Sequence, residues 1–367
     1  MPEAAGMFNP NRLSVARKRQ GLTKTDLAKR ARVDLRSVTA YEAGVYPPKL
    51  ETAESLAAAT KFPLEFLYGD DLDEPQPDTA SFRAMSKMTA TQRDMALSQG
   101  TIALHLSRWL ETRFELPELD LPDLSREDSP EAAADSLRRH WGIGELPVRN
   151  MIHLLEAKGV RIFSLAINAR EVDAFSLWKD ITPFVFLNGN KSSEHSRYDA
   201  AHELGHLVLH RHGTPQGRDS EREADRFAST FLMPTSSIIA HAMRNPSLPD
   251  LIKLKVIWIV SVAALNRRLY SAGMISDWQY RTLCIEIAKR GYRKHEPREA
   301  PREMSHILPS VFGALYEDGI GRADVAKALK IPRSELEQLM FGLTMTSIDG
   351  GRNQTGSPVK AKLTVVE

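Results

Sequence analysis

The stretch that decides the fold of this chain is AHELGHLVLH, residues 201–210, an H-E-x-x-H pattern inside an apolar run. Side chains four residues apart on an α-helix lie one above the other, about 6 Å apart along the axis, so His202 and His206 can bind one ion. Glu203 projects one position further round and can reach a water on that ion, which is the general-base role in metallopeptidases. The pattern therefore predicts a helix that supplies two zinc ligands and a base.

A catalytic zinc site needs a third protein ligand as well as an open position for water. Residues 219–233 have helical periodicity, and their acidic side chains include Glu221, Glu223 and Asp225. Glu223 shares a helix flank with Phe227, whose ring we expect in the same core as the H-E-x-x-H helix. We therefore predict Glu223 as the third ligand, with Glu221 as the second choice.

Three further side chains are candidates for contacts around the metal. His210 lies one turn beyond His206 and could stabilise an oxyanion or orient a ligand. The alternative for His210 is a partly exposed helix-end histidine that interacts with the helix dipole. Asp225 and Tyr198 could hydrogen-bond the ligands from behind, and a plain surface or core position is the alternative for each.

The segments before the motif change from helical to strand-like patterns. Helices are expected over 132–141 and 147–158, followed by runs rich in β-branched and aromatic residues at 160–165, 172–178 and 184–187. Ser192 or Ser193 can cap the motif helix. Helices, a small sheet and a metal helix predict an α+β fold that is mostly α.

The N-terminal segment, residues 11–69, reads as a series of short helices. LTKTDLA at 22–28 and VDLRSVTAYEAG at 33–44 resemble the helix-turn-helix of the XRE, or phage-repressor-like, family, and the likeness extends through Gly69. The resemblance implies a five-helix domain whose third helix enters the major groove of double-stranded DNA. The chain departs from the family pattern at Arg32, where the turn usually has glycine.

Electrostatics agree with DNA binding, because the first 36 residues carry far more basic than acidic side chains. The basic residues are Arg12, Arg17, Lys18, Arg19, Lys24, Lys29, Arg30, Arg32 and Arg36. We predict that Lys24 contacts phosphate and that the side chains able to reach base edges are Leu35, Arg36, Ser37 and Thr39. A helical interaction module with a solvated basic face is the alternative.

A second resemblance covers roughly residues 131–291. HELGHLVLH at 202–210, followed by EREADRFA at 221–228 and FLMP at 231–234, is similar to the ImmA/IrrE family of zinc metallopeptidases. That resemblance implies Zn²⁺ held by His202, His206 and Glu223, with Glu203 activating water. Members of the family are often paired with or fused to XRE domains and cleave repressors of that type, which implies a protein substrate.

Composition and linkers complete the domain prediction. The acidic, proline-bearing residues 70–78 predict a boundary across which the two parts move, and residues 89–114 predict a connector helix. We expect an XRE-type domain at 1–70, a linker with this helix at 71–130, a zincin-like metallopeptidase domain at 131–300, a helical region at 301–345 and a flexible tail at 346–367.

The net charge of +2 decides little, whereas the single cysteine, Cys284, excludes a disulfide framework and a cysteine-based metal site. With no export signal or membrane-spanning run in the sequence, we expect a cytoplasmic protein without a membrane partner.

These observations predict a transcriptional regulator that binds an operator, as a homodimer, and cleaves an XRE-type repressor in a stress or mobile-element response. The alternative is a DNA-binding repressor or antitoxin-like regulator whose zinc domain senses a ligand or partner without proteolysis.

Overall fold

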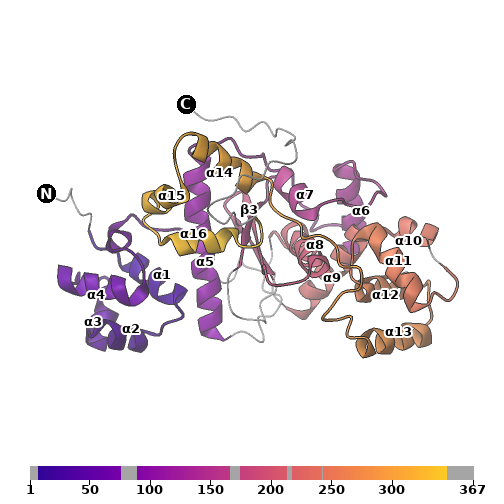
Figure 1. Ribbon diagram of the computed structural model, residues 1–367, viewed down its shortest axis with the longest axis horizontal. Helices are drawn as coiled ribbons and strands as arrows, with labels where there is room; N and C mark the ends of the chain where they lie inside the picture. The colour runs from indigo at the N-terminus through magenta and orange to yellow at the C-terminus, as the bar shows by residue number, and fades with distance from the viewer. Residues whose placement is uncertain (1–6, 76–88, 166–173, 213–216, 242, 345–367) are drawn as a thin grey trace.

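A computed structural model describes residues 7–75, 89–165, 174–212, 217–241 and 243–344 of the chain. They form an α+β structure that is mostly helical, with one small sheet near its middle (Figure 1). Within these described residues, no helix is long and apolar enough to cross a membrane.

The N-terminal domain is a bundle of short helices, each with a clear local cause. Its elements are α1 (Pro10–Arg19), α2 (Lys24–Ala31), α3 (Leu35–Glu42), α4 (Leu50–Thr60) and the 3₁₀ helix η1 (Leu64–Tyr68). Thr23 and Asp26 form a capping box at the start of α2, and Asp34 caps α3. The fifth expected helix is present as the 3₁₀ helix η1. Arg32 adopts the left-handed conformation (φ 55°) that the turn requires.

The sheet has three strands in the order β1-β3-β2, where β1 is Arg161–Ser164, β2 is Ala174–Lys179 and β3 is Thr182–Leu187. Strand β1 runs parallel to β3, and β2 runs antiparallel to it. This mixed sheet is the scaffold on which the predicted metal helix packs.

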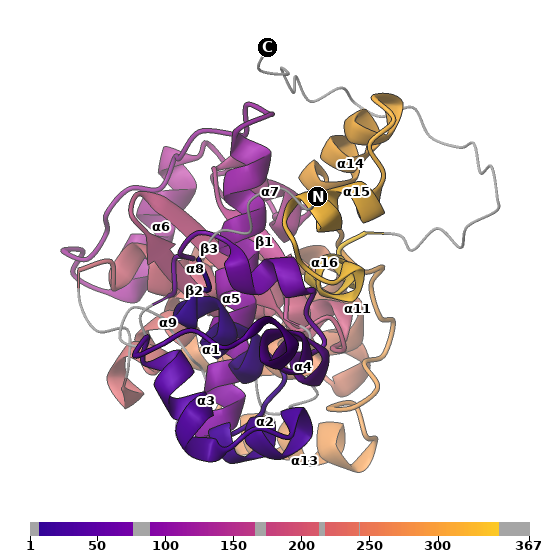
Figure 2. The same ribbon diagram turned by 90° about the vertical axis from the view of Figure 1, so that its left-hand side faces the viewer.

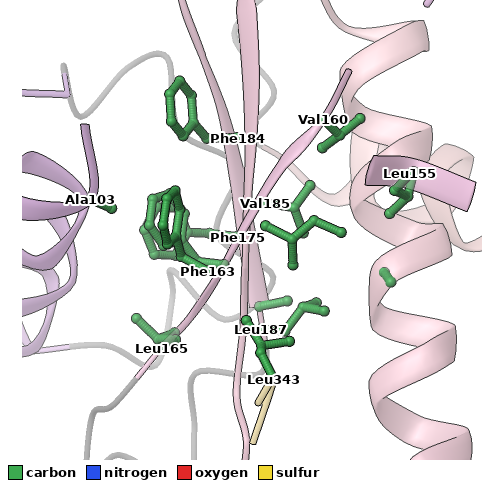
Figure 3. Close-up of a cluster of buried hydrophobic side chains, with 14 of the residues drawn as sticks. Ala103, Leu155, Val160, Phe163, Leu165, Phe175, Phe184, Val185, Leu187 and Leu343 are labelled. Atoms are coloured by element: carbon green, nitrogen blue, oxygen red, sulfur yellow. The ribbon is translucent and has the colours of Figure 1, made fainter. Parts of the chain in front are cut away.

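Side chains alternate between the two faces of the sheet, and both faces are covered. Phe163, Phe175 and Phe186 stack on the face toward α5 (Ala90–Glu111), whereas Val185 and Leu187 point to the opposite side (Figure 3). Helices α7 (Met151–Ala157) and α8 (Ser193–Leu209) cover that opposite side. The connector helix is thus part of the sheet's core.

Of the remaining helices, those up to α13 lie on the side of α8 and extend to the far end of the molecule, whereas the last three lie beside α5 (Figure 1). They are α6 (Pro130–His140), α9 (Arg218–Leu232), α10 (Thr235–His241), α11 (Leu248–Trp258), α12 (Val262–Ser271), α13 (Asp277–Lys289), α14 (Ile307–Glu317), α15 (Arg322–Ala328) and α16 (Arg333–Met340). The chain after α13 returns to the sheet, where α16 packs against β1 and α5.

The N-terminal domain rests on α5 through α1, which lies toward the viewer in Figure 2. At Gly21 (φ 64°) the backbone comes so close to α5 that an added Cβ would lie 2.9 Å from the sulfur of Met95. The acidic linker is expected to separate two parts that move, and in the structure α1 is packed directly on the connector helix.

We predict that the phenylalanine stack stabilises the whole domain. Phe186 is fully buried, with its ring centroid 4.3 Å from that of Phe175, so Phe186→Ala should lower the free energy of unfolding by about 3–5 kcal/mol. Chemical denaturation followed by circular dichroism measures this. Ile181→Ala is the control, because Ile181 is 72% exposed and should change stability by less than about 0.5 kcal/mol. Equal losses of stability for Phe186→Ala and Ile181→Ala would contradict the prediction that the phenylalanine stack stabilises the domain.

Candidate metal centre

Helix α8 carries the H-E-x-x-H pattern in the interior of the protein. Ser192 caps its first turn by accepting a hydrogen bond from the amide of His195. His202 and His206 are both buried, and their Nε2 atoms lie 3.1 Å apart. The helix therefore brings the two imidazoles together as the spacing predicts.

Glu221, on the first turns of α9, completes a group of three. Its Oε2 lies 3.3 Å from Nε2 of His202, and its Oε1 lies 3.4 Å from Nε2 of His206. Ligand atoms at about 2.0–2.2 Å from a tetrahedral zinc are about 3.3–3.5 Å from one another. The two imidazoles and the carboxylate thus offer three ligand atoms that lie close enough together to hold one metal ion.

Glu223, the residue predicted as the third ligand, is not part of this group in the structure, where its carboxylate lies 2.8 Å from Nε2 of His210. At 100° per residue, Glu221 and Glu223 lie on opposite flanks of the buried face of α9. Phe227 identifies the buried face of α9 but does not indicate which flank of that face lies beside the histidines. The angle at which α9 crosses α8 determines this, and it places Glu221, the second choice from the sequence, beside them.

The crossing of α8 and α9 depends on Gly205 at the centre of the motif. A Cβ at this position would lie 3.1 Å from Cδ1 of Phe227 and 3.2 Å from Cα of Ala224, which is tighter than most real contacts. Glycine therefore lets the two backbones approach closely. This approach brings Glu221, three residues before Ala224, within reach of both imidazoles.

The far nitrogens of both histidines have polar partners. Nδ1 of His202 lies 3.1 Å from Oδ1 of Asp225, and the hydroxyl of Tyr198 donates to the backbone carbonyl of Asp225 at 3.1 Å. Partners of this kind fix the tautomer of a metal-binding histidine and raise its basicity. Asp225 thus lies behind His202, whereas this hydroxyl contact of Tyr198 is with the backbone of Asp225 and not with a candidate ligand.

His210 links His206 to Glu223. Nδ1 of His206 lies 3.0 Å from Nδ1 of His210, whose Nε2 faces the Glu223 carboxylate. When Nε2 of His206 faces a metal, its Nδ1–H donates to His210, which in turn donates to Glu223. His210 therefore orients a candidate ligand.

The electrostatics of the three-residue group favour a charged carboxylate. Burial of Glu221 opposes its ionisation, but hydrogen bonds and positive charge from His202 and His206 outweigh that cost and lower its pKa. An ionised carboxylate is the form that binds a metal.

Glu203 has a contact that sequence reasoning missed. Its side chain is fully buried, and its Oε2 accepts a hydrogen bond of 2.7 Å from the hydroxyl of Ser176 on β2. Ser176 is paired with Val185 in the sheet register and shares its face toward α8. The signal for this contact in the sequence is Ser176 itself, a single hydroxyl on the inward face of an otherwise apolar strand.

The predicted DNA-contacting residues lie together on the N-terminal domain. Arg36 and Thr39 are exposed, Leu35 is 43% exposed, and Ser37 and Lys24 are half-buried. Arg17 holds α1 to α3 by a paired ion contact with Glu42, whose carboxylate is also 3.6 Å from the Lys24 ammonium. One face of α2 and α3 is thus open to a ligand.

Comparison with known families agrees with both parts of the structure. Residues 13–67 match the family model described as helix-turn-helix, and residues 155–270 match the model of the IrrE N-terminal-like domain of the M78 peptidases. A comparison with curated proteins finds no match. The first match contains α2 and α3 and all but the first three residues of α1, and the second contains α8 and α9.

We predict that Glu221→Ala weakens zinc binding far more than Glu223→Ala. Loss of Glu221 removes one of three donor atoms, so the loss of affinity should exceed the 10–100-fold typical of residues behind a ligand, whereas Glu223→Ala should stay within that range. Competition with a chromophoric chelator measures both affinities. A larger loss for Glu223→Ala would restore Glu223 as the ligand.

Proposed function

Because the chain joins an XRE-type helix-turn-helix domain to an ImmA/IrrE-type domain, we propose that it is a DNA-binding regulator with zinc-dependent endopeptidase activity. The observation that carries the proposal is the convergence of His202, His206 and Glu221 beside the buried Glu203. A site with three ligands and an adjacent base has the composition of a hydrolytic zinc centre.

In the proposed mechanism each residue has a separate task. His202, His206 and Glu221 would hold Zn²⁺, which would polarise a peptide carbonyl and lower the pKa of water to about 7. Glu203 accepts the proton of the attacking water and passes it to the leaving amine. Asp225 keeps His202 in the correct tautomer, while Ser176 orients the Glu203 carboxylate.

The proposed substrate is an XRE-type repressor, and the proposed setting is the cytoplasm during a stress or mobile-element response. Support comes from the family resemblance and from the XRE-type domain within the same chain. We further propose that the protein binds double-stranded operator DNA as a homodimer, because helix-turn-helix proteins read paired half-sites.

We predict that Glu203→Gln abolishes cleavage of a candidate XRE-type repressor while the protein still binds zinc. The substitution removes the proton acceptor but none of the three donor atoms. Mass spectrometry of the incubated mixture detects the fragments, and chelator competition confirms the zinc. Unchanged cleavage by the variant would refute the mechanism. No fragments from the zinc-loaded wild type with its repressor and activating signal present would instead favour a sensing role without proteolysis.

For the DNA-binding domain we predict different effects from its two best-placed basic residues. Lys24→Ala should weaken binding to all sequences and reduce the slope of log affinity against log salt by about 1, whereas Arg36→Ala should cost about 1–3 kcal/mol and relax the preference at one base position. Binding to duplexes selected from a random pool tests both. Arg113→Ala is the control, since its guanidinium stacks on Trp109 outside this domain. If Lys24→Ala and Arg36→Ala change DNA binding no more than Arg113→Ala does, the face of α2 and α3 is not the DNA-binding surface.

A further inference from the structure

The C-terminal helices repeat the helix-turn-helix near the N-terminus. Residues 319–342 correspond to residues 21–44 without a gap, at a constant offset of 298 residues. Both segments start and end with glycine, and the apolar positions of the second and third helices coincide. The internal residues that are identical are Asp26 and Asp324, Ala28 and Ala326, and Lys29 and Lys327.

The backbone repeats with the sequence. The turn between the two helices has a left-handed residue at the same place in each unit, Arg32 (φ 55°) and Lys330 (φ 57°). The next amide bonds back to the alanine carbonyl at 2.9 Å in both. The bounding glycines also have positive φ in both units, at 64° and 69° in the first and 78° and 72° in the second. Helices α14, α15 and α16 are therefore a second helix-turn-helix unit.

The second unit has the wrong charges for DNA. Glu335 and Glu337 of α16 occupy the places of Ser37 and Thr39 in α3. Carboxylates on a recognition helix repel phosphates, and Glu335 is also buried, so it cannot reach a base. In place of DNA, α16 faces other parts of this protein.

Helix α16 binds the first helix-turn-helix unit, at the end of α1. The Glu335 carboxylate binds the guanidinium of Arg19, at the end of α1, at 2.6 Å, and only 5% and 3% of the two side chains are exposed. Gln338, one turn further along α16, accepts a second hydrogen bond from the same guanidinium. Removing one partner of a buried pair with this geometry strongly destabilises the contact, because the other partner remains as an unpaired charge in the interior.

The same unit also contacts the segment that leads into the metal helix. Gly189, between β3 and α8, lies so close to Phe341 that an added Cβ would be 2.9 Å from the phenyl ring. In the segment just before α14, Arg302 donates to the carbonyls of Gly189 and Lys191, and Glu303 forms an ion pair with Arg197 of α8. The second unit, together with this preceding segment, thus bridges α1 and the start of α8.

We propose that α14–α16 is a helix-turn-helix unit that binds the DNA-binding domain instead of DNA, with Arg19 and Glu335 as its central contact. The contact holds the domain by α1, on α5 and α16, and leaves Leu35, Arg36 and Thr39 of α3 exposed. The DNA-binding domain and the metal-centre domain then move together as one rigid body. A bound operator therefore fixes the orientation of the metal centre relative to the DNA. This inference does not depend on peptidase activity.

Charge reversal in the full-length protein tests the proposal. Glu335→Arg should release the domain, which small-angle X-ray scattering detects as a larger radius of gyration. Hydrogen–deuterium exchange should become faster by about tenfold or more in α1 and α16. Glu337→Arg is the matched control, because it changes the charge equally on the same helix at a side chain that is 45% exposed and pairs only locally, with Arg333. The double variant Arg19→Glu/Glu335→Arg has the net charge of the wild type and should restore protection.

Three outcomes would overturn the proposal. The first is equal scattering and exchange for Glu335→Arg and Glu337→Arg. The second is a folded double variant that stays as open as the single one, since the effect would then not come from the pair. If circular dichroism shows that Glu335→Arg does not fold, the milder variants Glu335→Gln and Arg19→Gln replace it, and we expect faster hydrogen–deuterium exchange in α1 for each. The third outcome that would overturn the proposal is unchanged exchange in both of these variants.

Discussion

The close contact between α8 and α9 is the constraint on which the candidate metal centre depends. Gly205 has no side chain, so Ala224 and Phe227 of α9 can lie directly against the backbone of α8. This crossing places Glu221 beside the two imidazoles and Asp225 behind His202. The glycine between the two histidines is thus a structural requirement for the third donor atom, although it is not itself a ligand.

The sheet holds the same helix from the other side. Strand β2 presents Ser176 to the Glu203 carboxylate, and the indole of Trp178 donates to the carbonyl of Leu207 at 3.3 Å. Behind the sheet, α5 packs on the phenylalanine stack and also carries the N-terminal domain through α1. The connector helix therefore belongs to the core of the metal-centre domain and to the support of the DNA-binding domain at once.

Local patterns predicted most of the fold, because caps, helical periodicity and β-branched runs act within a few residues. The helices, the three strands and the pairing of His202 with His206 are of this kind. The choice between Glu221 and Glu223 depends on the angle at which two helices cross, and the contact of Arg19 with Glu335 joins residues at opposite ends of the chain. Neither the crossing nor the contact leaves a signal in a single segment, so only the three-dimensional structure distinguishes them.

The two helix-turn-helix units show why a fold pattern alone does not determine a ligand. Their turns and core positions agree because those features build the backbone. Their surfaces differ because the ligands differ: the first unit has Arg36 exposed on its third helix, α3, whereas the second has acidic side chains on its third helix, α16, and buries one of them against an arginine. A phosphate backbone and a guanidinium require opposite charges on the helix that binds them. The sign of the charge at the recognition positions, rather than the helix-turn-helix pattern, is therefore the feature that separates a DNA-binding unit from one that binds protein.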